Sequence, residues 1–418
     1  MKRTLALLLA LLGLSCTLLA ADRPKLGDPD FFPITAWGTW EWFDQDPDQE
    51  VFDDMAEAGI TIAGFASTTK CLDKIQKAGM YTFGHHQIPS DAFWAETVDE
   101  ATIRKGIRDT VEYFGHHPAI AGYLLQDEPN TSRFPILAIA ADEIKKADPG
   151  MRPYINLLPN YASPEQLGAP TWKDYARQYM DAVKAPILGY DFYALFEDPN
   201  EPLRPRYWTQ LAECREVALE SGVPMEVCLL SVGHLLYRIP TEDDLFFEVY
   251  SALLYGAKGI LYFTYFDPML TNYRHSPLDS YGNRTETWYA MRAVNNSVKC
   301  LAPILNRLES TAVYHFQPTA PMERADAPGP DSLIMGVSQP NQSLAIGEFR
   351  DRENGDIYVM VLNKDLKLST HINDLQWRNG TPENIRVCSQ KRKGELGWFG
   401  GENYWIAPGH AMLLKIEK

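Results

Sequence analysis

Short runs of β-type residues alternate with longer amphipathic segments between Phe31 and about Leu308. This alternation is typical of βα units, whose strands form a parallel sheet. The pattern occurs eight times, and the predicted strands are Phe32–Trp37, Thr61–Ala66, Tyr81–His86, Ile120–Asp127, Pro153–Leu158, Ile187–Tyr193, Met225–Val232 and Gly259–Tyr265. We predict a closed (β/α)8 barrel, of the TIM type, because no glycine-rich dinucleotide-binding turn follows the first strand, as it would in an open doubly wound sheet.

Helical periodicity follows most of these strands. The predicted helices are Asp48–Ala58, Ile103–Phe114, Phe134–Ala147, Trp172–Val183, Tyr207–Leu219, Glu242–Tyr255 and Glu286–Leu308. Glycines stand where several helices would end, since glycine readily adopts the left-handed conformation that closes a helix. They are Gly59, Gly79, Gly222 and Gly256.

Side chains two positions apart in a strand point to the same side of the sheet. In three predicted strands this rule aligns a deep glycine with a polar or aromatic residue at the strand end. The aligned sets are Gly122, Leu124, Gln126 and Glu128; Gly189, Asp191 and Tyr193; and Gly259, Leu261, Phe263 and Tyr265. We therefore predict a site at the C-terminal ends of the barrel strands, where barrel enzymes place their chemistry.

After about Leu308 the pattern of hydrophobic and polar residues changes to one of short strands and turns. The predicted strands are Leu344–Phe349, Ile357–Leu362, Thr370–Leu375, Tyr404–Ile406 and Ala411–Ile416, with a hairpin turn at Glu353–Asp356 and a loop over Pro318–Asp331. The predicted division is a signal peptide over 1–21, an α/β barrel over 22–309 and a small antiparallel β-sandwich over 310–418.

The N-terminus predicts export. Lys2 and Arg3 precede an apolar run from Leu5 to Leu14, and small residues follow up to Ala21, as in a secretory signal peptide. The expected location is periplasmic, cell-surface or secreted. Lipid anchoring through Cys16 is the alternative, although Gly13 stands where such a signal has Leu. No later segment reaches the roughly 20 apolar residues of a transmembrane span.

The composition of the chain limits the classes of molecule that it is expected to bind. Apolar residues make up 45% of the chain, as in a globular protein, and the formal net charge is −16. That charge argues against nucleic acid and disfavours polyanionic polysaccharides, because binding to phosphates needs clustered Lys and Arg. The cysteines beyond the leader are odd in number and widely spaced, so we expect buried thiols rather than disulfides or a zinc site.

The segment Gln126-Asp127-Glu128-Pro129 places two acids at the end of the fourth predicted strand. If Glu128 faces the barrel mouth, Asp127 points away, unless the strand bends there and both converge. A carboxyl group in this position can act as the general acid of glycoside hydrolysis, which also needs a second carboxylate as nucleophile or base. The alternative is structural, with Asp127 capping the next helix and Glu128 paired with a surface arginine.

With this motif the chain resembles the large clan of barrel glycoside hydrolases. Those enzymes carry an acid/base Glu at the end of strand four, which Glu128 matches, and a nucleophilic Glu at the end of strand seven. The segment from Trp405 to Lys415 is similar to the closing strand of many of them. Two departures are clear: Asp127 replaces the usual Asn, and strand seven ends in 229–234 without a Glu, since Glu226 comes too early.

The sequence therefore leaves more than one candidate for the residue that supplies the second carboxylate. Asp191 is the leading candidate because it aligns with Gly189 and Tyr193, and Glu197 and Asp267 are weaker ones. A further alternative pairs Asp127 with Glu128, as in hexosaminidases in which the acetamido group of the substrate attacks.

Aromatic and amide side chains near strand ends could bind sugar, since aromatic rings pack on the C–H faces of pyranoses. The predicted substrate-binding residues are Trp37, Trp40, His85, His86, Asn156, Tyr193, His234 and Tyr265. A zinc site of histidines with Asp191 is disfavoured, because adjacent His85 and His86 point to opposite faces of a strand. We expect no metal and no cofactor.

The predicted function is hydrolysis of O-glycosidic bonds in an oligo- or polysaccharide, with Glu128 as acid and Asp191 or Asp127 as its partner. A non-catalytic carbohydrate-binding protein on a degenerate barrel is the alternative, because strand seven lacks its Glu.

Overall fold

The computed structural model describes residues 31–39, 43–85, 99–198, 200–201, 203–268, 272–316, 327–337, 342–373 and 375–417. The predicted signal peptide, Cys16, Trp40 and His86 lie outside these ranges, as does most of the predicted loop after Pro318. Export and lipid anchoring therefore stay predictions.

Eight parallel strands form the barrel. They are β1 (Ile34–Ala36), β2 (Ile62–Ala66), β3 (Tyr81–Gly84), β4 (Ile120–Asp127), β5 (Arg152–Asn156), β6 (Leu188–Asp191), β7 (Met225–Leu230) and β9 (Ile260–Phe263). Their order in the sheet is β5-β4-β3-β2-β1-β9-β7-β6. A parallel bridge between Leu157 and Tyr190 joins the two edges, so the barrel is nearly closed. The predicted fold class and all eight strands are confirmed.

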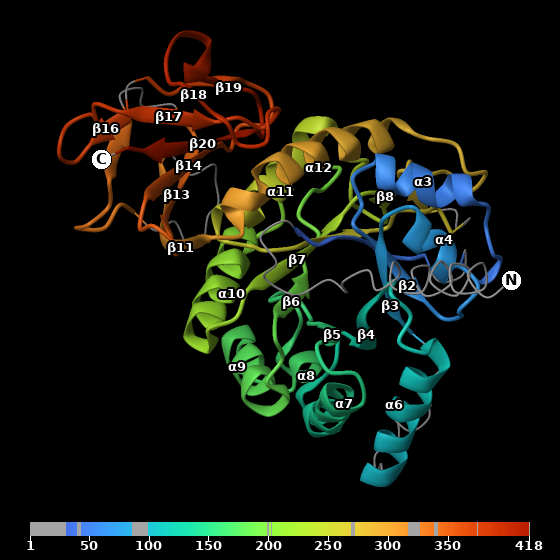
Figure 1. Cartoon of the computed structure of the whole chain (residues 1–418). Coiled ribbons are helices and arrows are strands. Elements are labelled where there is room, and N and C mark those ends of the chain that lie inside the picture. Colours follow the sequence, from blue (N-terminus) through green and yellow to red (C-terminus); the bar gives the residue numbers. More distant parts are fainter. Residues whose placement is uncertain are drawn as a thin grey trace, which may run out of the picture.

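Helices surround the barrel (Figure 1). They are α3 (Gln49–Glu57), α4 (Leu72–Lys77), α6 (Glu100–Phe114), α7 (Phe134–Ala147), α8 (Pro164–Leu167), α9 (Trp172–Val183), α10 (Tyr207–Ser221), α11 (Glu242–Leu254) and α12 (Glu286–Leu305), with a 3-10 turn, η1, at Thr131–Arg133. The helix predicted to end at Gly79 is α4, whose bounds were not predicted, and the short helix α8 was not predicted, because four to six residues are too few to show a helical period. The four glycines predicted at helix ends all have positive φ.

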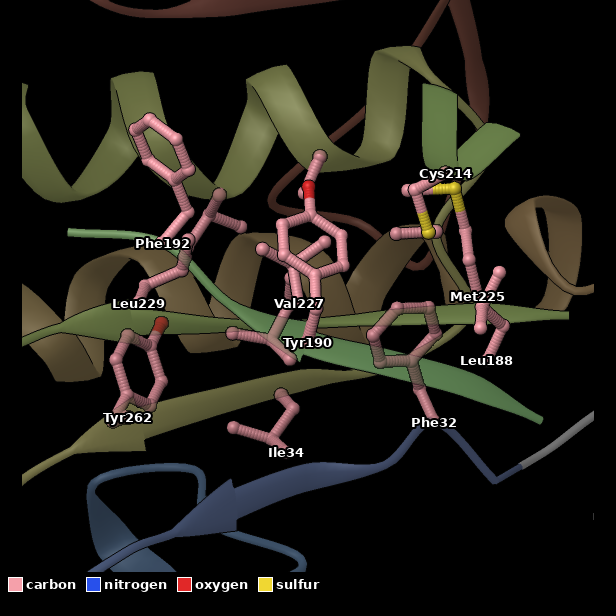
Figure 2. Packing of buried hydrophobic residues seen from close by; sticks show 14 of the residues in the cluster. Phe32, Ile34, Leu188, Tyr190, Phe192, Cys214, Met225, Val227, Leu229 and Tyr262 are labelled. Atoms are coloured by element: carbon pink, nitrogen blue, oxygen red, sulfur yellow. The ribbon is translucent and has the colours of Figure 1, made fainter. Parts of the chain in front are cut away.

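Strand alternation explains the packing between barrel and helices. Figure 2 shows Leu188 and Tyr190 of β6 and Val227 and Leu229 of β7 pointing outward, with Cys214 of α10 packed against them. The intervening residues point into the barrel. Because side chains two apart share a face, the apolar outer set and the functional inner set are specified by the same strands.

A buried ion pair occupies the barrel interior below the C-terminal mouth. Arg152 of β5 donates two hydrogen bonds, of 2.7 and 3.1 Å, to the carboxylate of Glu226 on β7. Glu226 has no solvent exposure. A Cβ on Gly259 would lie 2.4 Å from Glu226 Oε1, and one on Gly122 would lie 2.2 Å from Arg152 O. The glycines of β4 and β9 therefore make room for this pair.

The C-terminal region is antiparallel. One sheet contains β11 (Leu308–Phe316), β13 (Leu344–Asp351), β14 (Ile357–Asn363), β20 (Ala411–Ile416), β17 (Ile385–Cys388) and β18 (Leu396–Trp398), in that order. Two small sheets pair β12 (Ile334–Val337) with β16 (Leu375–Trp377) and β15 (Thr370–His371) with β19 (Trp405–Ile406). One face of the large sheet shares the barrel core, through residues such as Met360 and Leu413, and the other face has its own apolar cluster, which includes Val361 and Leu414.

Two predicted elements in and near this region are wrong. The helix expected to reach Leu308 ends at Leu305, and Leu308 begins strand β11. The single strand expected over Thr370–Leu375 is two strands that pair in different sheets, because the chain turns between them. Strands β12, β17 and β18 were not predicted. The hairpin turn at Glu353–Asp356 is confirmed between β13 and β14.

The cysteines within the described ranges are free thiols, and only Cys300 is partly exposed. No helix in the described part of the chain is long and apolar enough to cross a membrane.

The buried Arg152–Glu226 pair gives a first prediction. In Glu226→Ala the guanidinium of Arg152 keeps its charge but loses its partner, so the free energy of unfolding should fall by about 3–5 kcal/mol. Denaturant unfolding at neutral pH measures this. The control is Lys105→Ala, which removes an exposed ion pair with Asp109 and should cost less than about 1 kcal/mol. Equal losses in the two variants would contradict a special role for the buried pair.

Candidate active site

A pocket of about 280 Å³ opens at the C-terminal ends of the barrel strands. Its lining combines carboxyl groups, an amide and aromatic rings. The residues are Trp37, Asp127, Glu128, Asn156, Tyr161, Asp191, Tyr193, Cys228, His234, Leu235, Tyr237 and Phe263. The site predicted from the alternation of side chains along the strands therefore coincides with a cavity.

Both acids of the strand-four motif line the pocket. The register of β4 against β5 shifts between Leu124 and Gln126, as in a β-bulge, so the simple alternation of the strand breaks before its end. Glu128 then takes a φ of 45°, in the left-handed region that non-glycine residues rarely adopt, and its N–H donates to Asn156 O at 2.8 Å. Of the two predicted arrangements, the structure has the one in which the strand bends and both acids converge.

Asn156, at the end of β5, holds two of the carboxyl groups. Its Nδ2 donates to Asp127 Oδ1 at 3.0 Å and to Asp191 Oδ1 at 3.0 Å. Asn156 and Asp191 are both buried, with 3% and 4% of their surfaces exposed. The predicted sugar-binding amide thus contacts the candidate catalytic acids directly.

Glu128 and Asp191 share a hydrogen bond between their carboxyl groups. Such a bond needs one proton on the pair, because two carboxylates have no donor. Glu128, just after β4, and Asp191, at the end of β6, are therefore in direct contact through their side chains.

Burial sets the protonation of all three acids. It raises the pKa of Asp127 to about 7, with the charge of Glu128 adding to the effect and the hydrogen bond from Asn156 opposing it. Burial also raises the pKa of Glu128 and raises that of Asp191 well above its usual range. Asp127 and Glu128 touch solvent through the pocket, but protein atoms surround them on their other sides. These acids can therefore carry protons near neutral pH.

Aromatic rings form the rest of the wall. Tyr193 packs against Tyr237 and Phe263, with ring centroids 5.6 and 5.5 Å apart. The guanidinium of Arg204 lies 4.0 Å from the ring centroid of Tyr161, and its Nε donates to Tyr193 O at 3.2 Å. Arg204 therefore ties the loops after β5 and β6 together, and the ring edges that face the pocket are held in place.

His234 lines the pocket from a short two-stranded antiparallel sheet. It belongs to β8 (Gly233–His234), which pairs with β10 (Tyr273–Arg274). Its ring lies 4.4 Å from that of Tyr273, and its Nδ1 is 3.0 Å from Asn272 Oδ1. Partial burial lowers the pKa of this imidazole, so His234 is neutral at pH 7 and can donate or accept one hydrogen bond.

Two predicted residues do not line the pocket. Tyr265 was expected as a sugar platform, but its ring is fully buried, and its hydroxyl accepts from Trp288 Nε1 at 3.1 Å. The strand alternation ends with β9 at Phe263, which takes the pocket position instead. His85 is exposed at the end of β3, outside the pocket lining. Of the weaker candidates for the second acid, Glu197 is paired with Arg274.

Five lining residues were not predicted as site residues: Tyr161, Cys228, Leu235, Tyr237 and Phe263. Phe263 could have been found, because it aligns with Gly259 and Leu261 in its strand. Cys228 is the residue two positions after Glu226 on the inner side of β7. The other three lie on loops, whose course strand phase does not specify.

No group of three potential metal ligands is present among the residues that the structure describes. A larger cavity, of about 420 Å³, lies at the opposite end of the barrel beside the N-terminal ends of β1, β7 and β9. There Lys258 Nζ donates to Leu308 O at 2.7 Å and thereby holds the junction of α12 and β11. We place the candidate site in the smaller pocket, because it collects the acids.

Comparison with solved structures supports the fold. A β-galactosidase from Bacillus circulans sp. alkalophilus aligns over 95% of this chain and 100% of its own, with a TM-score of 0.63 and 9% identity. A glycoside hydrolase family 5 protein from Bacteroides vulgatus aligns over 92% and 89%, with a TM-score of 0.57 and 10% identity. The chain spans 62% of a β-galactosidase from the psychrophilic Marinomonas ef1, with a TM-score of 0.48 and 11% identity. No family model and no curated protein sequence matches.

The raised acid pKa values predict a pH dependence of stability. Between about pH 4, where Asp ionises in the unfolded chain, and about pH 7, where Asp127 ionises in the fold, the native state holds the extra proton. The stability that this proton contributes is therefore full below pH 4 and is lost as pH rises through 7. Because more than a third of Asp127 is exposed through the pocket, solvent screens its charge, and the loss is smaller than full burial would give.

Asp127→Asn removes this titration, so its free energy of unfolding should fall less steeply than that of the wild type over this range. Denaturant unfolding at several pH values measures the two slopes. Asp109→Asn, at an exposed position on α6, is the matched control and should keep the wild-type slope. A wild-type slope in Asp127→Asn would show that Asp127 is not protonated in the native pocket.

Proposed function

We propose that this chain is an exported glycoside hydrolase that cleaves an O-glycosidic bond of an oligo- or polysaccharide. The observation that carries the proposal is the coupled pair of Glu128 and Asp191 in an aromatic-lined pocket at the barrel mouth. Glycoside hydrolysis needs two carboxyl groups that share the work of acid and nucleophile or base, and aromatic rings suit the apolar faces of sugars. The barrel likeness to β-galactosidase and family 5 structures agrees with it.

Glu128 is the proposed general acid and Asp191 the proposed nucleophile. In the first step Asp191 forms a bond to the anomeric carbon while the glycosidic bond breaks, and Glu128 gives its proton to the leaving oxygen. In the second step Glu128 takes a proton from water, whose oxygen attacks the anomeric carbon and releases Asp191. Both steps fit a pair that holds one proton at rest.

The direct side-chain contact of Glu128 and Asp191 favours retention of anomeric configuration. Inverting enzymes hold their carboxyl groups about 6.5–9.5 Å apart to admit a water molecule, whereas retaining enzymes hold them about 5–5.5 Å apart. Carboxyl groups joined by a hydrogen bond leave no space for water between them. We therefore expect the first product to keep the configuration of the substrate.

The adjacent acids leave a second route to retention. Because the bend in β4 turns Asp127 into the pocket beside Glu128, Asp127 could orient an acetamido group of the substrate that attacks in place of Asp191. This route requires a 2-acetamido sugar. Matched aryl glycosides with and without that group separate the two mechanisms.

Carbohydrate binding without catalysis is the second candidate function. It is favoured by the inner side of β7, which presents Cys228 to the pocket and has its only acid, Glu226, in the buried ion pair. Such a protein would bind sugar and release none.

Replacement of the proposed acid tests the hydrolase directly. Glu128→Gln should lower turnover of oligosaccharides about 10²–10⁴-fold, because the amide cannot give a proton to the leaving oxygen. The loss should be smaller for dinitrophenyl glycosides, whose leaving group needs no proton. A reducing-sugar screen over neutral glycans, followed by rate measurement on the best substrate, provides the comparison.

Glu112→Gln, at an exposed position on α6, is the control for this experiment and should keep wild-type turnover. Unchanged turnover in Glu128→Gln would refute its role as acid. Wild-type protein that binds a glycan but never releases sugar would favour the binding function.

The stereochemistry of the first product is a separate prediction. Proton NMR of the anomeric signals during the first minutes of hydrolysis should show the configuration of the substrate. A first product of opposite configuration would mean that water attacks directly and that Asp191 is not the nucleophile.

A further inference from the structure

An exposed indole ring that packs against a glycine lies on the C-terminal region, away from the pocket. Trp398, at the end of β18, has 67% of its surface exposed. The buried Gly400 lies directly against this ring, since a Cβ built there would be 2.4 Å from the indole. Asn403 Nδ2 donates to Trp398 O at 2.6 Å. The turn after β18 therefore backs the ring and fixes its orientation.

A second exposed indole belongs to the same surface. Trp405 on β19 is 53% exposed, and its ring lies 4.7 Å from that of His371 on β15. Tyr404 packs against both His371 and Phe399, with centroids 5.6 and 5.0 Å apart. A connected set of rings thus supports the segment between the two tryptophans. We call Trp398, Trp405 and their supports His371, Tyr404 and Gly400 the tryptophan surface.

This surface adjoins the mouth side of the barrel. Barrel helices run opposite to the strands, so the N-terminal end of α11 lies at the mouth. His410, five positions after Trp405, stacks on Phe246 near that end with a centroid distance of 3.7 Å and contacts Asp243. The loop before α11 carries His234 and Tyr237 of the pocket. Figure 1 shows β18 and β19 together in the C-terminal sheets.

We propose that the tryptophan surface binds a neutral polysaccharide chain and keeps it close to the pocket. This inference rests on the proposed hydrolase function and extends it to a polymeric substrate. A flat indole backed by glycine on one side leaves its other face for the C–H face of a pyranose, at little cost in side-chain entropy. The net charge of −16 opposes an anionic polymer. The pocket of about 280 Å³ holds only a short part of a polymer, so a second contact outside it would add avidity.

Affinity electrophoresis tests the proposal with the full chain carrying Glu128→Gln, so that no polymer is cut during the run. Native gels contain one neutral polysaccharide each, namely galactan, galactomannan, xylan or a mixed-linkage glucan, and one further gel contains the anionic polymer polygalacturonate. We expect retardation in at least one, and a tenfold or greater loss of affinity in Trp398→Ala and in Trp405→Ala. Tyr289→Ala, which removes an aromatic side chain that is 56% exposed on α12, should bind like its parent.

Gly400→Ala tests whether binding needs the packing of Gly400 against the Trp398 ring, because this variant keeps the tryptophan itself. Its φ of 162° is open to any residue, but the added methyl group would collide with the indole of Trp398. This variant should lose affinity although both tryptophans remain. With Glu128 intact, all of these variants should hydrolyse a small aryl glycoside at the parental rate.

Several results would overturn the proposal. They are the absence of retardation in every neutral polymer, retardation by polygalacturonate alone, and unchanged affinity in the tryptophan variants. A dimer in sedimentation that Trp398→Ala converts to monomer would instead make a second copy of the chain the occupant. Failure of the hydrolase proposal is distinguishable, because it would appear as wild-type protein that releases no sugar from any glycan while the binding results stand.

Discussion

The crowding of three carboxyl groups around one amide is the constraint on which the site depends. Asp127, Glu128 and Asp191 meet within hydrogen-bonding reach of Asn156 or of one another, and among the described residues no arginine or lysine lines the pocket with them. Like charges at such distances cannot all be ionised, so protons must remain on part of the cluster. The bend at the end of β4 and the amide on β5 create this crowding, and both the pH dependence of stability and the capacity for acid catalysis follow from it.

The barrel interior below the site explains why the acids occupy these strands. On β7 the inward-facing acid is Glu226, which forms the ion pair with Arg152, and the next inward position holds Cys228. The glycines of β4 and β9 leave space for that pair. The carboxylate that β7 contributes, that of Glu226, thus lies in the barrel interior, and the carboxyl groups at the mouth come from β4 and β6 instead.

The sequence was sufficient for the barrel and for the acids, but not for the pocket as a whole. Strand alternation located Asp191 correctly, because β6 is regular up to that residue. It could not decide between the two orientations of Asp127, which depend on a bulge in β4 that no residue type announces. Tyr193 and Tyr265 both lie two residues beyond the end of their strands, where alternation no longer applies: Tyr193 lines the pocket, whereas Tyr265 is buried against Trp288. Loop residues such as Tyr161 were missed, because their positions follow from contacts such as that with Arg204, which join segments distant in sequence.

The order of the strands also determines which side of the pocket carries the carboxyl groups. The acids and Asn156 come from β4, β5 and β6, which are consecutive in the barrel, whereas Trp37 and Phe263 follow β1 and β9 on the opposite arc. The carboxyl groups therefore come from one arc of the barrel, whereas aromatic rings come from both arcs, because Tyr161 and Tyr193 follow β5 and β6. In the proposed mechanism the hydrogen bond between Glu128 and Asp191 breaks when substrate enters, and the shared proton stays on Glu128, which faces the leaving oxygen. Substrate binding would thus release the Asp191 carboxylate to act as the nucleophile.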